Sequence, residues 1–169
     1  MQQLKELLAV GDRKGIGRAG EVASLIRDDP NLLGDLLDNL SAGGPVVRSH
    51  AAHALMQIGL ERPDLLQPYT RRLCSEISGL DQWEIQEQLM KIFPLLHWTA
   101  GEKKTVLQLV RDNLIHKSAI VRACALQALY DFALADADLL PEAKRLLQEA
   151  EGSGAKSSQA RARKLLAKL

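Results

Sequence analysis

The sequence predicts an all-α protein built from stacked pairs of helices, and three observations lead to this class. Leucine and alanine supply 52 of the 169 residues, whereas Phe, Trp and Tyr together supply only six. This excess of helix formers over β-branched and aromatic residues argues against a β-sandwich or a β-barrel. Similar segments recur about 37 residues apart, and breaks containing Gly or Pro separate the helical stretches. A chain of this length suits one domain of ordinary size.

The repeat is clearest in two segments, Val46–Ile58 (VVRSHAAHALMQI) and Ile120–Phe132 (IVRACALQALYDF). Both carry the pattern V-R-x-x-A-x-x-A-L, and they lie 74 residues apart, which is two steps of 37. Such a period is typical of proteins whose helix pairs stack side by side. Steps of 37 residues define three columns that are apolar at all but one position: Ala51, Gln88, Ala125 and Ala162; Leu55, Ile92, Leu129 and Leu166; Ile58, Leu95, Phe132 and Leu169.

Each helix pair has an apolar face that it cannot bury alone, so neighbouring pairs are expected to share one elongated core. An N-terminal helical cap at 1–30 is expected to precede four repeats within a single domain. The repeats would lie at about 31–62, 63–98, 99–135 and 136–169. We expect helices near 2–9, 19–28, 31–41, 45–59, 64–79, 82–97, 101–116, 118–134, 138–151 and 156–169.

Turn and capping signals justify these boundaries along the first half of the chain. Gly43 and Gly44 break the chain, and Pro45 suits the first turn of the helix that follows. Asp81 and Glu84 have the spacing of a capping box, in which each side chain satisfies a free N–H at a helix start.

Further signals justify the boundaries in the second half. Thr99 and Glu102 also have capping-box spacing, and Ser118 and Ser157 are placed to cap their helices. Pro94 is expected to kink or end the helix in which it lies. The prolines expected in first turns, where a missing N–H costs little, are Pro68 and Pro141.

The V-R-x-x-A-x-x-A-L helices, each preceded by a Leu-rich helix, resemble HEAT repeats over residues 31–169. The resemblance implies a right-handed α-α superhelix, an armadillo-like α-solenoid in which the second helix of each pair lines the concave side. HEAT repeats also carry an Arg early in that second helix, which forms a ladder with an Asp of the preceding turn. Arg48 and Arg122 match this position, whereas Ile85 and Gln159 occupy it in the other repeats, so a continuous ladder is not expected.

Enzymes of similar architecture provide the first alternative. Deoxyhypusine hydroxylase is built from HEAT-like repeats and holds iron with His-Glu pairs, but this sequence contains no His-Glu dipeptide. HEAT-like DNA glycosylases use a basic groove lined with aromatics, and Asp81 and Trp83 fit that pattern, whereas the net charge of +1 does not. The segment Gly15–Gly20 reads G-x-G-x-x-G, but a nucleotide site needs a strand before it, so we interpret the segment as a turn. We expect no catalytic site and no cofactor.

His50 and His53 lie three residues apart and could both contact a metal from one helix face. Zinc needs at least a third ligand within about 2.0–2.3 Å. Cys124 occupies the repeat position of His50, but equivalent positions two repeats apart should be separated by roughly 20 Å. We therefore expect no metal site and interpret both histidines as partly exposed residues of a groove.

The outward stripe of the second helices is the predicted binding surface. Its charge runs from neutral through acidic to basic, which suits a protein or peptide partner better than a uniformly charged polymer. The protein is thus expected to be a non-enzymatic interaction or scaffold module, with Met90 as a central anchor. The candidate partner-binding residues are His50, His53, Gln57, Gln86, Glu87, Met90, Cys124, Gln127, Asp131, Arg161, Lys164 and Lys168.

A second alternative is binding of nucleic acid or another acidic surface through the C-terminal helix. The segment 152–169 has five basic residues and no acidic one. Against this, the whole chain has 22 basic and 21 acidic residues, so no overall field attracts a polyanion. Nucleic-acid binding is therefore not the first expectation.

The sequence favours a cytoplasmic location. Lys5 and Glu6 interrupt the first apolar residues, so no signal-peptide core is formed, and no run of 18 apolar residues could span a membrane. Cys74 and Cys124 lie 50 residues apart without metal-type spacing, and we expect them to be reduced thiols.

Overall fold

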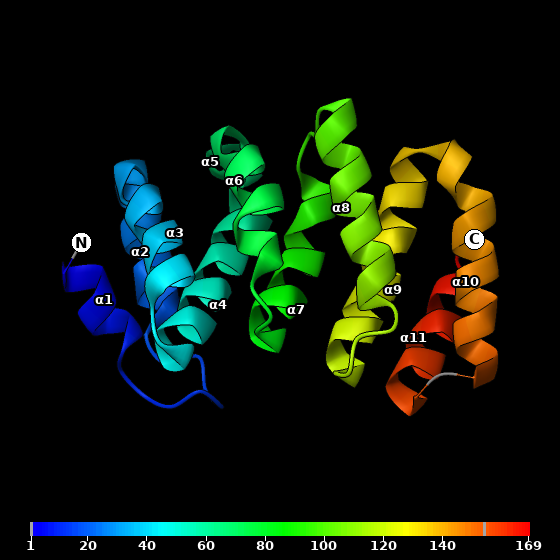
Figure 1. The fold of residues 1–169 in the computed structure, drawn as a ribbon, viewed down its shortest axis with the longest axis horizontal. Helices are drawn as coiled ribbons and strands as arrows, with labels where there is room; N and C mark the ends of the chain where they lie inside the picture. Colours follow the sequence, from blue (N-terminus) through cyan, green and yellow to red (C-terminus); the bar gives the residue numbers. More distant parts are fainter. Residues whose placement is uncertain (1, 154) are drawn as a thin grey trace. The chain divides into compact units, whose positions relative to one another are not determined.

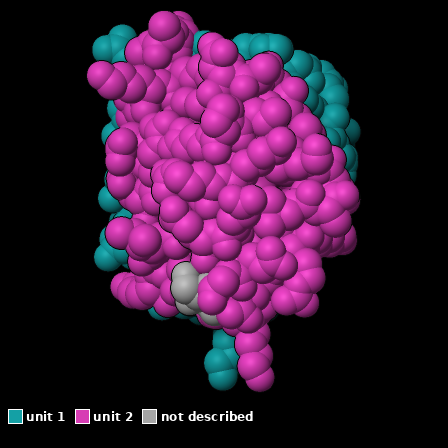
Figure 2. Space-filling model, turned by 90° about the vertical axis from the view of Figure 1, so that its right-hand side faces the viewer, with its two compact units in different colours: residues 1–98 teal, residues 99–169 magenta. Residues whose placement is uncertain are grey.

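The computed structural model describes residues 2–153 and 155–169, which form helices and turns with no β-strand among them. The all-α class predicted from composition is therefore confirmed. The chain divides into two compact units, the first ending at Trp98 and the second running from Thr99 to Leu169 (Figure 2). This division falls where the sequence places the boundary between the second and third repeats.

The first unit is centred on one helix, α4, against which α2, α3 and α7 all pack (Figure 1). Ala51 and Ala54 are buried on α4 and are small enough to let neighbouring helices come close. A Cβ atom at Gly59 would lie 2.7 Å from Ile92 Cγ2 and 2.9 Å from Leu66 Cδ1, so only glycine fits there. The α-helices are α1 (Gln2–Leu8), α2 (Ala19–Asp28), α3 (Leu33–Ala42), α4 (Pro45–Glu61), α5 (Pro63–Leu66), α6 (Thr70–Ser75) and α7 (Trp83–Ile92). The 3₁₀ turns are η1 (Pro30–Leu32), η2 (Gln67–Tyr69), η3 (Ile77–Gly79) and η4 (Phe93–Leu95).

Prolines determine where several of these helices begin and end. Pro45 lies in the first turn of α4, and Pro94 follows the end of α7 at Ile92, both as predicted. The single helix predicted at 64–79 is wrong, because the chain forms α5, η2, α6 and η3 instead. Pro68 lies in the first turn of η2, and because it has no backbone N–H it cannot donate the hydrogen bond that would continue an α-helix from α5.

The second unit is also centred on one helix, α9, against which α8, α10 and α11 pack (Figure 1). Like α4, α9 has 17 residues, and its core includes Val121, Ala125 and Leu129. The elements are α8 (Ala100–Asn113), α9 (Ala119–Ala135), η5 (Ala137–Leu139), α10 (Leu140–Ser153) and α11 (Lys156–Leu166).

The capping predictions in this unit have mixed outcomes. Thr99 and Glu102 form the predicted capping box, in which Thr99 Oγ1 accepts from the backbone of Glu102 and the Glu102 carboxylate accepts from that of Thr99. Pro141 lies in the first turn of α10, as predicted. Ser118 is at the N-cap of α9, but its hydroxyl makes no capping bond. The prediction for Ser157 is wrong, because α11 begins one residue earlier and Ser157 lies inside it.

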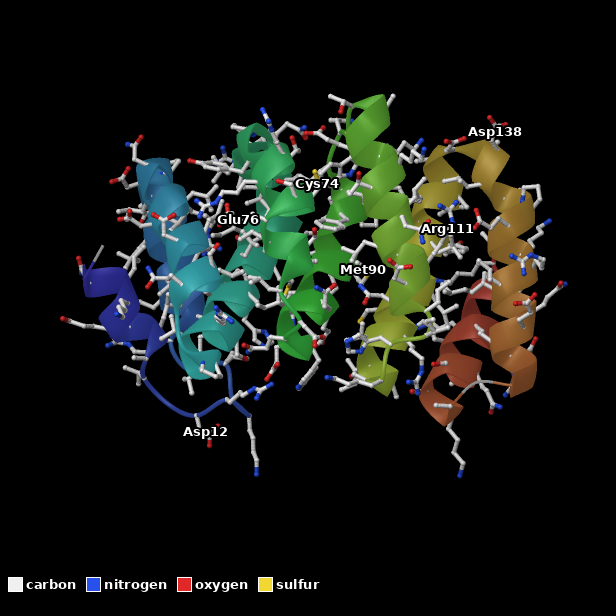
Figure 3. The ribbon with its side chains drawn as sticks, in the orientation of Figure 1. Asp12, Cys74, Glu76, Met90, Arg111 and Asp138 are labelled. Carbon is white, nitrogen blue, oxygen red and sulfur yellow. The ribbon has the colours of Figure 1, made fainter. Side chains whose placement is uncertain are left out.

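Charged pairs connect elements within each unit. In the second unit, Arg111 on α8 donates from Nε and Nη2 to the two carboxylate oxygens of Glu142 on α10, at 2.7 and 2.9 Å. In the first unit, Arg72 on α6 bonds both Asp38 on α3 and Glu76, of which Figure 3 labels Glu76. Hydrogen bonding to the Arg111 guanidinium lowers the pKa of Glu142, and the bonds from Arg72 and Ser41 lower the pKa of Glu76.

Most members of the predicted apolar columns are buried, and the exceptions lie at helix ends. Leu95 is 42% exposed because α7 has already ended, and Leu169 is 37% exposed because it lies beyond the last residue of α11. Leu166, that last residue, is half-buried. The buried members are Ala51, Leu55, Ile58, Gln88, Ile92, Ala125, Leu129, Phe132 and Ala162.

Both cysteines, Cys74 and Cys124, are buried, and no disulfide joins them. Buried thiols of this kind pack as small apolar side chains. No helix in the described ranges is both long and apolar enough to cross a membrane.

Candidate functional site

Four residues of the predicted binding stripe are buried, which corrects their assignment to an accessible surface. They lie on α4, α7 and α9, whose packing covers more of each helix than a single apolar stripe. The side-chain amide of Gln86, for example, donates hydrogen bonds to the carbonyls of Ser78 and Leu80, both at 2.9 Å. The four residues are His50, Gln86, Met90 and Cys124.

The other members of the stripe keep some exposure. In the first unit these are His53, Gln57 and Glu87, and Glu87 forms an ion pair of 2.8 Å with Lys91. In the second unit the accessible members are Gln127, Asp131, Arg161, Lys164 and Lys168.

A hydrogen-bonded chain joins three of the accessible residues in the second unit. Arg161 Nη1 on α11 donates to Gln127 Oε1 at 2.9 Å, and Gln127 Nε2 donates to Asp131 Oδ1 at 2.9 Å on α9. Burial raises the pKa of Asp131 above its usual value, although the bond from Gln127 and the charges of Arg161 and Lys168 act in the opposite direction. The interactions among these residues stabilise the contact of α9 with α11.

The first unit contains a pocket that includes one of the predicted residues, His53. The loop after α1, the N-terminal half of α4 and the start of α7 enclose a volume of about 480 Å³. We call it the Trp83 pocket. It is lined by Arg13, Lys14, Ser49, His53, Trp83 and Glu84.

A buried histidine holds the loop that forms one wall of the Trp83 pocket. The two ring nitrogens of His50 lie 2.8 Å from the carbonyl oxygen of Leu8 and 2.9 Å from that of Asp12 (Figure 3 labels Asp12 on the loop). Gly17 has a φ of +49°, and a Cβ atom there would lie 2.6 Å from His50 Cε1. Residues 15–18 of the G-x-G-x-x-G segment form a turn, as expected, and its last two residues begin α2. Gly17 is required because the loop crosses the imidazole closely.

An ion pair fastens the same loop to α7. Arg13 donates from Nε and Nη2 to the two carboxylate oxygens of Glu84, with the second bond at 2.9 Å. The Glu84 side chain is only 3% exposed. Burial acts to raise its pKa, but the hydrogen bonds and the charge of Arg13 outweigh burial, so the pKa of Glu84 lies below its usual value. The predicted capping box of Asp81 and Glu84 is wrong, because the N-cap of α7 is Gln82 and Glu84 binds Arg13.

Two polar residues of α4 face the Trp83 pocket one helical turn apart. Ser49 is completely buried, and its hydroxyl has no hydrogen-bond partner among the described residues. His53 is half-buried; burial lowers the pKa of its imidazole, Lys91 and His50 lower it further, and Glu87 opposes the shift. The His53 ring is therefore neutral at pH 7, because even its ordinary pKa is about 6.5.

Among the described residues that line the Trp83 pocket, the hydrogen bonds that activate a catalytic serine are not formed. A catalytic serine needs a hydrogen-bonded base that a third group orients. Here Ser49 Oγ makes no bond to His53, and Glu84 is held by Arg13. What the pocket offers a ligand is a hydroxyl, unused N–H groups of Arg13, the Lys14 ammonium and the indole of Trp83.

The sequence identified only part of this pocket. Trp83 and His53 were singled out for other reasons, whereas Ser49, Lys14 and the pairing of Arg13 with Glu84 were missed. The pair joins residues 71 positions apart, so no local sequence pattern could have predicted it.

No group of three His, Cys, Asp or Glu side chains suited to a metal occurs in the part of the chain that the structure describes. No protein-family model matches the sequence, and no curated protein matches it significantly.

Proposed function

We propose that this chain is a cytoplasmic, non-enzymatic protein-interaction module of the HEAT-like type, and that it binds an acidic segment of a partner protein at the Trp83 pocket. The observation that carries the proposal is the buried Ser49 hydroxyl, which has no partner, in the same pocket as the Lys14 ammonium. A buried hydroxyl without a hydrogen-bond partner lowers the stability of the fold by about 1–3 kcal/mol, and a bond to a ligand oxygen would recover part of that loss. The Lys14 ammonium has no carboxylate partner among the described residues, so a negatively charged group is the complementary ligand.

The charge of the first unit favours a single carboxylate over a polyanion. Residues 1–98 contain ten Lys and Arg against thirteen Asp and Glu. A nucleic acid carries one charge per about 1.7 Å of duplex and would meet this net negative surface along its length. A partner carboxylate entering the Trp83 pocket meets the Lys14 ammonium and the unused N–H groups of Arg13, whose own charge is compensated by Glu84, without that wider repulsion.

Equivalent packing in the two units supports the HEAT-like part of the proposal. The two V-R-x-x-A-x-x-A-L segments form α4 and α9, each the central helix of its own unit. Arg48 donates to the carbonyl of Ser41 at 2.7 Å, and Arg122 donates to the carbonyl of Lys117 at 3.1 Å. Arg48 thus bonds the last turn of the preceding helix α3, and Arg122 bonds the turn before α9. These backbone contacts take the place of the aspartate ladder that HEAT repeats commonly carry.

The basic helix α11 is the basis of the second candidate function, an acidic-surface binder. Arg163 forms an ion pair with Glu151, and Arg161 donates to the neutral amide of Gln127 and keeps its charge. Three lysines in or just after α11 are exposed and have no such partner among the described residues. Ala162 and Leu165 are buried in the second unit, so the apolar face of α11 is not available to a membrane surface. These lysines are Lys156, Lys164 and Lys168.

The decisive experiment is selection from a library of random peptides on the immobilised full chain, followed by affinity measurement on the selected peptides. We expect enrichment of Asp and Glu, and binding at least about tenfold weaker for Lys14→Glu. Lys104→Glu, which changes the same charge on an exposed residue of α8, is the matched control and should bind normally.

Peptides that carry no acidic residues, or that bind Lys14→Glu as tightly as the parent, would contradict the proposal. A DNA duplex tests the second candidate function. If DNA binds tightly, weakens steeply between about 50 and 200 mM salt, and is lost in a Lys164→Ala, Lys168→Ala double variant, the basic-helix function is correct instead.

A further inference from the structure

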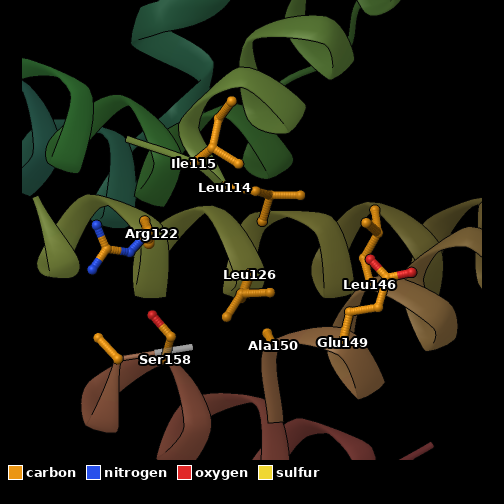
Figure 4. A pocket seen from close by; sticks show the side chains of 9 residues that line it. Leu114, Ile115, Arg122, Leu126, Leu146, Glu149, Ala150 and Ser158 are labelled. Carbon is orange, nitrogen blue, oxygen red and sulfur yellow. The ribbon is translucent and has the colours of Figure 1, made fainter. Parts of the chain in front are cut away.

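The second unit contains a pocket of its own, which the protein-binding proposal does not use. It has a volume of about 410 Å³ and lies among the α8–α9 turn, α9, α10 and the N-terminal end of α11 (Figure 4). We call it the Leu126 pocket, after the residue at its centre. Its apolar walls consist of Leu114, Ile115, Leu126, Leu146, Ala150 and Ala155.

One end of the Leu126 pocket is polar and positively charged. Ser158 is 3% exposed, and its hydroxyl has no hydrogen-bond partner among the described residues. Arg122 lies at the same end, and Figure 4 shows the Ser158 oxygen pointing toward the helix that carries it. Arg122 uses Nη1 for the carbonyls of His116 and Lys117, and no carboxylate of the described chain neutralises its charge.

The rest of the pocket does not offer a second charged subsite. Glu149 lies at the opposite end, where its carboxylate accepts from Arg145 Nη1 at 2.6 Å, so its charge is already compensated. Between the two ends, Leu126 and Leu146 present aliphatic surface. Ile115, which lines the pocket, is 87% exposed, so apolar surface remains uncovered there.

We propose that the Leu126 pocket binds a small aliphatic carboxylate, such as a free medium-chain fatty acid. The carboxylate accepts from the Ser158 hydroxyl and from the unused N–H groups of Arg122, which supplies both the missing partner and the missing counter-charge. The alkyl chain extends over Leu126 toward Leu146 and covers the apolar walls. The volume falls in the range of pockets that enclose small molecules, about 300–1,000 Å³.

The test is titration of the full chain with decanoate below its micelle concentration, followed by calorimetry and by NMR of isotope-labelled methyl groups. We expect saturable binding that shifts the methyl signals of Leu126 and Ala150. 1-Decanol, which has the same chain without the charge, should bind at least about tenfold more weakly. Equal binding of decanoate and decanol, or no binding of decanoate, would overturn the proposal.

Variants separate the head-group contacts from effects on folding. Arg122→Gln should weaken decanoate about tenfold or more, whereas Lys144→Gln, a matched loss of an exposed charge on α10, should change nothing. Ser158→Ala should weaken decanoate about threefold to tenfold while leaving thermal stability equal or higher, because the hydroxyl has no partner to lose. A Ser158→Ala variant that binds decanoate normally would refute the assigned head-group site.

A peptide ending in leucine provides the last arm of the test. Its terminal carboxylate on an aliphatic side chain presents similar chemistry from a protein source. We expect decanoate to bind more tightly, since the pocket walls can cover its longer chain. Tighter binding of the peptide than of decanoate would overturn the proposal and make the Leu126 pocket a protein-docking site.

Discussion

Replacement of His50 by alanine is expected to be one of the most damaging single changes in the first unit. The imidazole is fully buried and lies within hydrogen-bond distance of two backbone carbonyls, at 2.8 Å from Leu8 and 2.9 Å from Asp12. Leu8 is itself buried, so loss of the ring leaves the Leu8 carbonyl without a hydrogen-bond partner, which costs about 1–3 kcal/mol. Asp12 is exposed and its carbonyl can bond to water, and a ring with a single N–H donates to only one of the two carbonyls, so Asp12 adds no further cost.

Loss of the packed ring adds a further cost of about 1–2 kcal/mol, because the cavity is small and the loop can partly collapse into it. We therefore expect His50→Ala to lower the free energy of unfolding by about 2–5 kcal/mol in urea titrations. Gln57→Ala, on the same helix at a half-buried position, is the control and should cost less than about 1 kcal/mol. Amide exchange should also accelerate in the loop between α1 and α2. Unchanged stability, or unchanged protection of that loop, would refute the anchoring role of His50.

Three further predictions test packing and charge. Gly59→Ala should lower the stability of the fold by about 1–2 kcal/mol in thermal melts, because its Cβ would lie 2.7 Å from Ile92 Cγ2. Gly20→Ala, whose Cβ would make only ordinary contacts, is the control and should raise the stability by up to about 1 kcal/mol. Because the pKa of Glu84 is lowered in the folded state, Glu84 stabilises the fold at pH values above its unfolded pKa of about 4.3, and this stabilisation is lost as pH falls through the folded pKa. Glu84→Gln should therefore remove this contribution to acid sensitivity, as measured by urea titrations at several pH values. The raised pKa of Asp131 has the opposite effect on stability, because its charged form is disfavoured in the folded state. Asp131→Asn should therefore be more stable than the parent at pH 7 and lose that advantage as pH falls, and a lower stability at pH 7 would contradict this.

Local sequence signals predicted the helix boundaries where one residue type determines the backbone. Pro45 and the pair of Thr99 and Glu102 are examples, because a proline ring or a capping side chain acts on its immediate neighbours. The same reasoning failed at 64–79, where a Leu-rich stretch suggested one helix and Pro68 divides it. Apolar periodicity describes which face is buried, but it does not say where the backbone breaks.

The candidate pockets were harder to predict, because both depend on contacts between distant segments. The repeat spacing put His50 on an open stripe, yet residues 9–18 lie outside the repeat and cover it. Periodicity carries no information about a loop that is not periodic. The one available signal was the glycine pattern around Gly17, which indicates a backbone that must pass close to something.

Ser49 and Ser158, whose buried hydroxyls have no hydrogen-bond partner among the described residues, have a consequence for any attempt to engineer this protein for heat resistance. A buried hydroxyl without a hydrogen-bond partner destabilises the folded chain, so alanine at either position should be among the first replacements that such a screen recovers. Such variants would lack the hydroxyls on which both proposed sites depend, so selection for stability alone would weaken the binding that we propose for each unit.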